Sequence, residues 1–194
     1  NTVFMKKILI VEDSLPIITL HCSIARKAGL EPVVAKTLAE VKELTDRFDE
    51  FYCAIIDYSL PDAPEGQAIK YIVDRKVPSI VMTGMLDDKV RNHILRLPII
   101  DYITKESKQA FHYVLTLLKR LQRNSKVKIL VVDDSSSSRA YLTHLLARHN
   151  FTVLQAKCGV HALEVLEENP DVKLIITDKE MPRMDGIQLC NAVR

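Results

Sequence analysis

Short apolar runs that end in a carboxylate constrain the fold of this chain more than any other feature. The run Tyr52–Ile56 stops at Asp57, and the run Ile8–Val11 stops at Glu12 and Asp13. A run that is apolar throughout predicts a strand covered on both faces, as in a parallel sheet with helices on either side. Acids at the carboxyl ends of such strands would lie where open α/β sheets bind ligands.

The same runs recur at a fixed distance along the chain. Asp134 lies 121 residues after Asp13 (134 minus 13), and Asp178 lies 121 residues after Asp57 (178 minus 57). Two landmarks that share one offset indicate a tandem duplication of a domain of about this length. We therefore predict that residues 5–123 form one domain, 124–126 a short linker, and 127–194 a second domain.

The first copy alternates between strand-like and helix-like segments. Strands are expected at residues 6–11, 31–35, 52–57, 78–82 and 99–103, and helices at 15–28, 37–46, 65–75, 87–95 and 107–123. This alternation predicts an α/β fold with a five-stranded parallel sheet and right-handed crossovers. The expected strand order is the doubly wound, flavodoxin-like 2-1-3-4-5.

The second copy repeats the same plan but supplies only the first three strands before Arg194. Its third strand, at 173–177, would then be an apolar edge of the sheet, which invites aggregation. We therefore expect a tandem pair with the second copy truncated, in a chain that is either a fragment of a longer protein or ordered only this far.

Composition excludes several classes of function. A net charge of +2 over 194 residues argues against a direct nucleic-acid surface. No run approaches the roughly 18 apolar residues of a membrane span. The four cysteines show no CxxC pairing, so neither a disulfide framework nor a zinc site is expected. A reducing, cytoplasmic compartment fits this pattern.

Three acids are expected to converge in the first copy. In a 2-1-3 order the strands that end at Asp13 and Asp57 are neighbours, which brings Glu12 to the same place. Two carboxylates about 4 Å apart repel by about 4 kcal/mol at an effective dielectric of 20. A hard divalent cation compensates such crowding, and Mg²⁺ takes carboxylates together with phosphate oxygens. The sequence therefore predicts a Mg²⁺ site, with Asp57 able to form an aspartyl phosphate.

Two further strand ends carry complementary groups. Thr83 follows the fourth strand and can donate to a phosphoryl oxygen, and Lys105 follows the fifth and can hold one as a point charge. Each residue alone has a plainer interpretation: Asp13 with Ser14 as a helix cap, Thr83 as a strand end before a turn, Lys105 as a solvated lysine. The four strand ends together favour one site.

These motifs resemble those of the receiver domains of bacterial two-component response regulators, two in tandem with the second incomplete. The motifs are an acidic pair after the first strand, an Asp after the third with Pro four residues on, a Thr after the fourth and a Lys after the fifth. In this sequence they are Glu12-Asp13, Asp57, Pro61, Thr83 and Lys105, then Asp133-Asp134, Asp178 and Pro182.

The resemblance implies that Asp57 and Asp178 accept a phosphoryl group from a histidine kinase or a phosphotransfer protein. It implies Mg²⁺ held in the first copy by Asp13 and Asp57, with Glu12 acting through water. In the second copy the corresponding set is Asp134, Asp178 and Asp133.

The resemblance also implies a conformational switch. Thr83 and Tyr102 would form the switch pair, altering the face made by the fourth helix, the fifth strand and the fifth helix. The signal would control an output beyond Arg194, such as a diguanylate cyclase. Such a module assists its own phosphorylation and is not itself an enzyme.

Alternative interpretations stay open at this point. Residues 62–65 replace the family's usual hydrophobic-Asp step, so one copy, the first above all, could be an unphosphorylated scaffold or dimerisation unit. The apolar band of helix 107–123 either packs in the core, or part of it meets the second domain or another chain, as in a homodimer. A phosphatase with Asp57 as nucleophile fits less well, because residue 59 is Ser where an Asp-x-Asp motif needs an acid.

Overall fold

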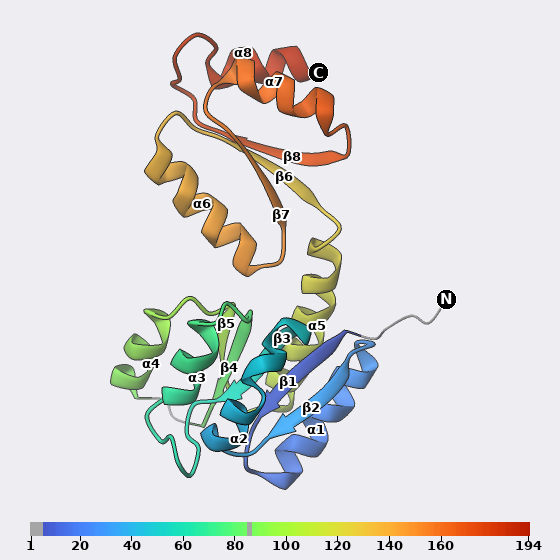
Figure 1. Cartoon of the computed structure of the whole chain (residues 1–194), viewed down its shortest axis with the longest axis vertical. Helices are drawn as coiled ribbons and strands as arrows, with labels where there is room; N and C mark the ends of the chain where they lie inside the picture. Colours follow the sequence, from blue (N-terminus) through green and yellow to red (C-terminus); the bar gives the residue numbers. More distant parts are fainter. Residues whose placement is uncertain (1–5, 85–86) are drawn as a thin grey trace. The chain divides into compact units, whose positions relative to one another are not determined.

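The computed structural model describes residues 6–84 and 87–194 and divides into two compact units, at residues 1–119 and 120–194 (Figure 1). Residue 5, where the first domain was expected to begin, lies outside the described residues. Within the described ranges, no helix has the length and apolar character needed to cross a membrane.

The first unit contains a five-stranded parallel sheet in the order β2-β1-β3-β4-β5, which confirms the predicted fold class. Its strands are β1 (Lys7–Val11), β2 (Glu31–Ala35), β3 (Phe51–Asp57), β4 (Ser79–Thr83) and β5 (Asp101–Thr104). Its helices are α1 (Leu15–Lys27), α2 (Leu38–Glu43), α3 (Gln67–Val73), α4 (Asp88–Leu95) and α5 (Lys108–Asn124), with a 3₁₀ turn at Thr45–Glu50.

Two helical layers cover this sheet. Helices α1 and α5 lie on one face, and α2, α3 and α4 lie on the other (Figure 1). The central strands are buried on both faces, which is why their sequences do not alternate. Every residue of Ile8–Val11, Ala54–Ile56 and Ile80–Met82 is at most 1% exposed.

Two helices are shorter than their sequence patterns suggested. The helix expected at 37–46 stops at Glu43, and the 3₁₀ turn that follows carries the buried Phe48 into an edge-to-face contact with Phe51. The helix expected at 65–75 begins only at Gln67. Gly66 before it has a φ of 77°, and the ring of Tyr58 occupies the space where a side chain at Gly66 would lie. Tertiary packing sets both boundaries.

The second unit contains a three-stranded parallel sheet in the order β7-β6-β8. Its elements are β6 (Lys128–Val132), α6 (Ser136–Arg148), β7 (Thr152–Ala156), α7 (Gly159–Glu168), β8 (Val172–Thr177) and α8 (Gly186–Val193). Helix α6 covers one face, and α7 and α8 pack together on the other (Figure 1). Strand β8 is an edge of this sheet and leaves Leu174 49% exposed.

Gly186 allows the start of α8 to approach the end of β8. A β-carbon at this position would overlap the carbonyl oxygen of Asp178 and crowd the side chain of Thr177. Gly186→Ala should therefore lower the free energy of unfolding of the second unit by about 1–3 kcal/mol, the usual cost of overpacking. Urea denaturation followed through second-unit amide resonances would measure this. Gly84→Ala is the control, because among the described residues, chain neighbours apart, no atom lies within 4 Å of the added carbon. An equal loss there would refute the steric explanation.

His21 is a titratable group buried between α1 and α5. Its side chain is 1% exposed, its ring centroid lies 5.6 Å from that of Phe111, and within the described residues neither ring nitrogen has a hydrogen-bond partner. Burial, assisted by the positive charge of Lys105, lowers the pKa of His21 from 6.5 to about 4. The folded state therefore excludes a proton that the unfolded chain binds.

This difference predicts a pH dependence of stability. The contribution of neutral His21 is fully present above pH 6.5 and is lost as the pH falls through 6.5 towards 4, because protons then favour the unfolded chain. The loss should reach about 3 kcal/mol. His21→Leu should remove this part of the pH dependence in denaturation measured between pH 7 and 4. His112→Leu, at an exposed position of α5, should retain it, and equal slopes for both variants would contradict the assignment.

Candidate functional site

The predicted acids of the first unit meet at the carboxyl edge of the sheet. Strands β1 and β3 are neighbours, with Val11 paired to Ile56, so Glu12 and Asp13 follow β1 beside the end of β3 at Asp57. Carboxylate oxygens of the three acids lie within 4.8 Å of one another. Glu12 and Asp57 are 1% and 8% exposed, whereas Asp13 is open to solvent.

Lys105 closes this acidic cluster. Its ammonium nitrogen lies 2.7 Å from Oε2 of Glu12 and 2.8 Å from Oδ2 of Asp57. Its backbone N–H donates to the carbonyl of Thr83 at 2.8 Å, which fixes Lys105 against the end of β4. The side chain is 13% exposed, so the interpretation of Lys105 as a solvated lysine is wrong. In this structure the lysine offsets the repulsion between two buried carboxylates.

Opposing effects act on the pKa of Glu12 in this cluster. Burial raises the pKa of Glu12, the hydrogen bond from Lys105 opposes that rise, and the negative charge of Asp57 adds to it. The backbone N–H of Ser14 also donates to Oε1 of Glu12 at 3.1 Å. Further positive charge at the exposed Asp13 side would relieve the remaining repulsion, and a hard cation with oxygen ligands suits that position.

The two expected switch residues lie on neighbouring strands. Thr83 ends β4 and is 1% exposed, and Asp57 pairs with Met82 just before it. Tyr102 lies in β5 and pairs with Val81 of β4. Its side chain is half-buried against the core on the face covered by α2, α3 and α4. Burial raises the pKa of Tyr102. The structure thus brings Thr83 to the edge that carries Asp57 and holds Tyr102 deeper in the sheet.

The second unit repeats the acidic cluster in a more open form. Carboxylate oxygens of Asp133, Asp134 and Asp178 lie within 4.8 Å of one another, and the backbone N–H of Asp178 donates to the carbonyl of Val132 at 2.9 Å. Asp133 is 9% exposed, but Asp134 and Asp178 are exposed. In the described part of this unit, no lysine forms an ion pair with these acids as Lys105 does in the first.

The role of Asp62 was not predicted. Its two carboxylate oxygens accept hydrogen bonds from the backbone N–H groups of Leu38 and Ala39, at 2.8 and 2.9 Å, and so cap the start of α2. These hydrogen bonds hold the pKa of Asp62 below its usual value. The sequence showed that residues 62–65 were unusual, but the partners lie 24 and 23 residues earlier, beyond any local pattern.

Comparison with known proteins agrees with this geometry. Residues 129–194 match the family model of the response regulator receiver domain. The chain is 46% identical over 69 residues to the chemotaxis protein CheY1 of Helicobacter pylori, which covers 35% of this chain and 56% of that protein. It is 39% identical over 74 residues to the two-component response regulator ORR5 of Oryza sativa, covering 38% and 55%. The chain thus spans about half the length of these curated relatives.

Solved structures extend the similarity to both units. A protein described as a two-component system response regulator/GGDEF domain protein superimposes with a TM-score of 0.82 at 35% identity, covering 97% of this chain and 77% of that one. The receiver domain of the Pseudomonas aeruginosa sensor histidine kinase PA1611, solved with magnesium in its active-site cleft, shares the fold, with a TM-score of 0.52 at 22% identity over 60% of this chain and 96% of that one.

The fold and the acidic clusters define a signalling module of the two-component type. This chain belongs to the response regulator receiver family. Receiver domains are signalling modules rather than enzymes.

Removing Lys105 should expose the repulsion that it compensates. Lys105→Ala leaves Glu12 buried without its ion-pair partner, so the free energy of unfolding should fall by about 3 kcal/mol in the absence of divalent metal. Added Mg²⁺ should restore part of that loss. Urea denaturation with and without Mg²⁺ measures both effects.

The matched control is Lys70→Ala, because Lys70 pairs with Asp74 in the same unit at an exposed position. An exposed pair contributes little to stability, so this variant should behave as the wild type does. Equally small effects of both substitutions would mean that Lys105 does not stabilise the buried acids.

Proposed function

We propose that this chain is a phosphoacceptor module of a two-component system, with Asp57 and Asp178 accepting a phosphoryl group. The donor would be a histidine kinase or a histidine phosphotransfer protein. The observation that carries the proposal is the convergence of Glu12, Asp13 and Asp57, with the ammonium group of Lys105 paired to Glu12 and Asp57. The proposed domains are residues 5–123 and 127–194, joined by 124–126.

The donor set suits Mg²⁺, which prefers carboxylate and water oxygens. Asp13 and Asp57 are proposed as direct ligands in the first unit, with Glu12 acting through water. In the second unit Asp134 and Asp178 take these roles, and Asp133 acts as Glu12 does. When bound, the ion supplies positive charge that lowers the repulsion between a carboxylate and an incoming phosphoryl group.

The chemistry of the first unit follows from its side chains. A carboxylate oxygen of Asp57 attacks the phosphorus of a phosphohistidine, the P–N bond breaks, and the imidazole leaves with its electron pair and takes up a proton. Lys105 then loses one of its two carboxylate partners and is placed to hold a phosphoryl oxygen. The hydroxyl of Thr83 donates a hydrogen bond to another phosphoryl oxygen. In response to this local change in charge, movement of Thr83 and Tyr102 would alter the conformation of the face made by α4, β5 and α5.

The module is proposed to control an output domain C-terminal to Arg194. Similar solved structures are described as response regulator/GGDEF proteins, which supports a C-terminal output of that kind, such as a diguanylate cyclase. We propose a cytoplasmic location for the module. The apolar face of helix 107–123 is the proposed contact of a homodimer. Its residues Phe111 and Leu115 line a pocket together with Leu20 and Ile24 of α1.

A scaffold without phosphorylation is the second candidate for the first unit. The altered residues 62–65 suggested it, but Asp62 is used to cap α2 and takes no part in the acidic cluster. The proximity of the three acids and the ion pairs of Lys105 with Glu12 and Asp57 support the phosphoacceptor over the scaffold.

Substitution of each acceptor tests the proposal. With acetyl phosphate and Mg²⁺, Asp57→Asn should lose uptake in the first unit and Asp178→Asn in the second, because an amide is not a competent nucleophile. Neither substitution should unfold the chain, since each removes one member of a group of like charges. Mass spectrometry of peptides from each unit gives the site of uptake.

Asp74→Asn changes an exposed acid outside the cluster and should leave uptake intact. Continued phosphorylation of first-unit peptides in Asp57→Asn would exclude Asp57 as the acceptor. Absence of uptake in the first unit of the wild type would favour the scaffold.

A further inference from the structure

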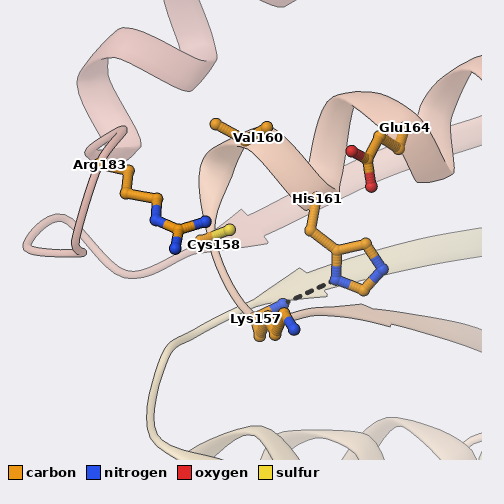
Figure 2. A pocket seen from close by; sticks show the side chains of 6 residues that line it. All are labelled: Lys157, Cys158, Val160, His161, Glu164 and Arg183. Atoms are coloured by element: carbon orange, nitrogen blue, oxygen red, sulfur yellow. Dashed lines mark hydrogen bonds between the residues drawn. The ribbon is translucent and has the colours of Figure 1, made fainter.

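A pocket in the second unit has no part in the proposed phosphoryl transfer. It has a volume of about 390 Å³ and lies at the start of α7, as Figure 2 shows. Three of the side chains that line it are basic. The lining residues are Lys157, Cys158, Val160, His161, Glu164 and Arg183.

The equivalent place in the first unit contains carboxylates. The 121-residue offset matches residues 36–40 to 157–161, and it matches Asp62, which follows Pro61, to Arg183, which follows Pro182. Asp62 accepts hydrogen bonds from the first two N–H groups of α2. Glu40 accepts another from the N–H of Lys36 at 2.6 Å. The first unit therefore shows that this backbone arrangement binds an oxyanion.

At the positions that match by this offset the second unit carries the opposite charge, and the backbone differs at Arg183, which has a φ of 70° where Asp62 has no positive φ. His161 replaces Glu40 and accepts from the N–H of Lys157 at 3.3 Å. Arg183 replaces Asp62, and its guanidinium points towards Cys158 (Figure 2). Cys158 stands where Thr37 caps α2 and forms no side-chain hydrogen bond to the start of α7. Gly159 and Val160 match Leu38 and Ala39. Their backbone N–H groups have no carboxylate in the position of Asp62, because residue 183 is Arg.

This arrangement concentrates positive charge. A helix N-terminus carries about half a positive charge, and Arg183 and Lys157 add their own. Within the described residues neither side chain forms an ion pair. Glu164, which lies further along α7, is the acid among the lining residues, so the pocket stays positive overall. Helix starts of this kind bind anions favourably.

We propose that this pocket binds a small phosphate-type oxyanion. The anion would take the place that the Asp62 carboxylate takes in the first unit. The N–H groups of Gly159 and Val160 and the guanidinium of Arg183 are its donors, and Lys157 and His161 add charge at the rim. The pocket has more room than one carboxylate needs, and its two cationic side chains favour a doubly charged ligand. The proposal does not depend on phosphorylation of Asp178.

The test is a titration of the whole chain with inorganic phosphate, without Mg²⁺ and at constant ionic strength balanced by chloride. Amide resonances of Gly159 and Val160 should shift and saturate. Arg183→Ala should weaken binding about ten-fold, as expected for loss of a charge-assisted hydrogen bond. Arg183→Asp should abolish binding, because it replaces a cationic donor with a carboxylate that repels the anion. Arg183 has a φ of 70°, a conformation that Asp tolerates.

Two controls separate this pocket from other effects. Arg148→Ala removes the same charge from an exposed position at the end of α6 and should bind phosphate as the wild type does. Asp178→Asn should also retain the shifts, which distinguishes the pocket from the phosphoacceptor site. Absence of saturation, or equal shifts in Arg183→Asp and the wild type, would overturn the proposal. Acetate that binds as tightly as phosphate would overturn the assignment to a phosphate-type ligand.

Discussion

Repulsion between the buried carboxylates of Glu12 and Asp57 is the constraint on which the first unit depends. These acids meet because β1 and β3 are neighbours, and that order requires crossovers through helices on both faces of the sheet. Lys105 offsets this repulsion. It follows the end of β5, which lies two strands away from β3 in the sheet. The charge balance of the site therefore requires all of β1, β3, β4 and β5 in their observed order. Phosphorylation of a carboxylate held this way would alter that balance at once.

The duplicated units show how one backbone plan carries different charge. Both bring three acids to the carboxyl edge of the sheet, because the apolar strands that precede these acids are repeated. The loops beside those acids differ. In the first unit Asp62 caps the neighbouring helix, and in the second Arg183 leaves the equivalent helix start open. Because the strands position the acids in both units, the loop side chains can differ without moving the acidic clusters.

The sequence predicted the strand order and the convergence of the acids, because continuous apolar runs and strand-end carboxylates are local signals. It could not predict that Lys105 contacts Glu12, since that contact joins residues 93 apart and depends on side-chain conformation. The predicted end of α2 at residue 46 was wrong, because the 3₁₀ turn that buries Phe48 replaces the last part of the expected helix. His21 gave no sequence signal, since its burial results from the packing of α1 against α5. Local patterns thus defined the framework, and long-range packing determined the charges within it.

We propose that acids from neighbouring strands form one divalent-cation site in each unit. Paramagnetic broadening by substoichiometric Mn²⁺ tests it directly, because Mn²⁺ takes the same oxygen ligands as Mg²⁺. We expect selective loss of amide resonances around Glu12, Asp13 and Asp57, and around Asp133, Asp134 and Asp178, with recovery on addition of excess Mg²⁺. Broadening centred on other acidic residues, or spread evenly over the surface, would contradict it.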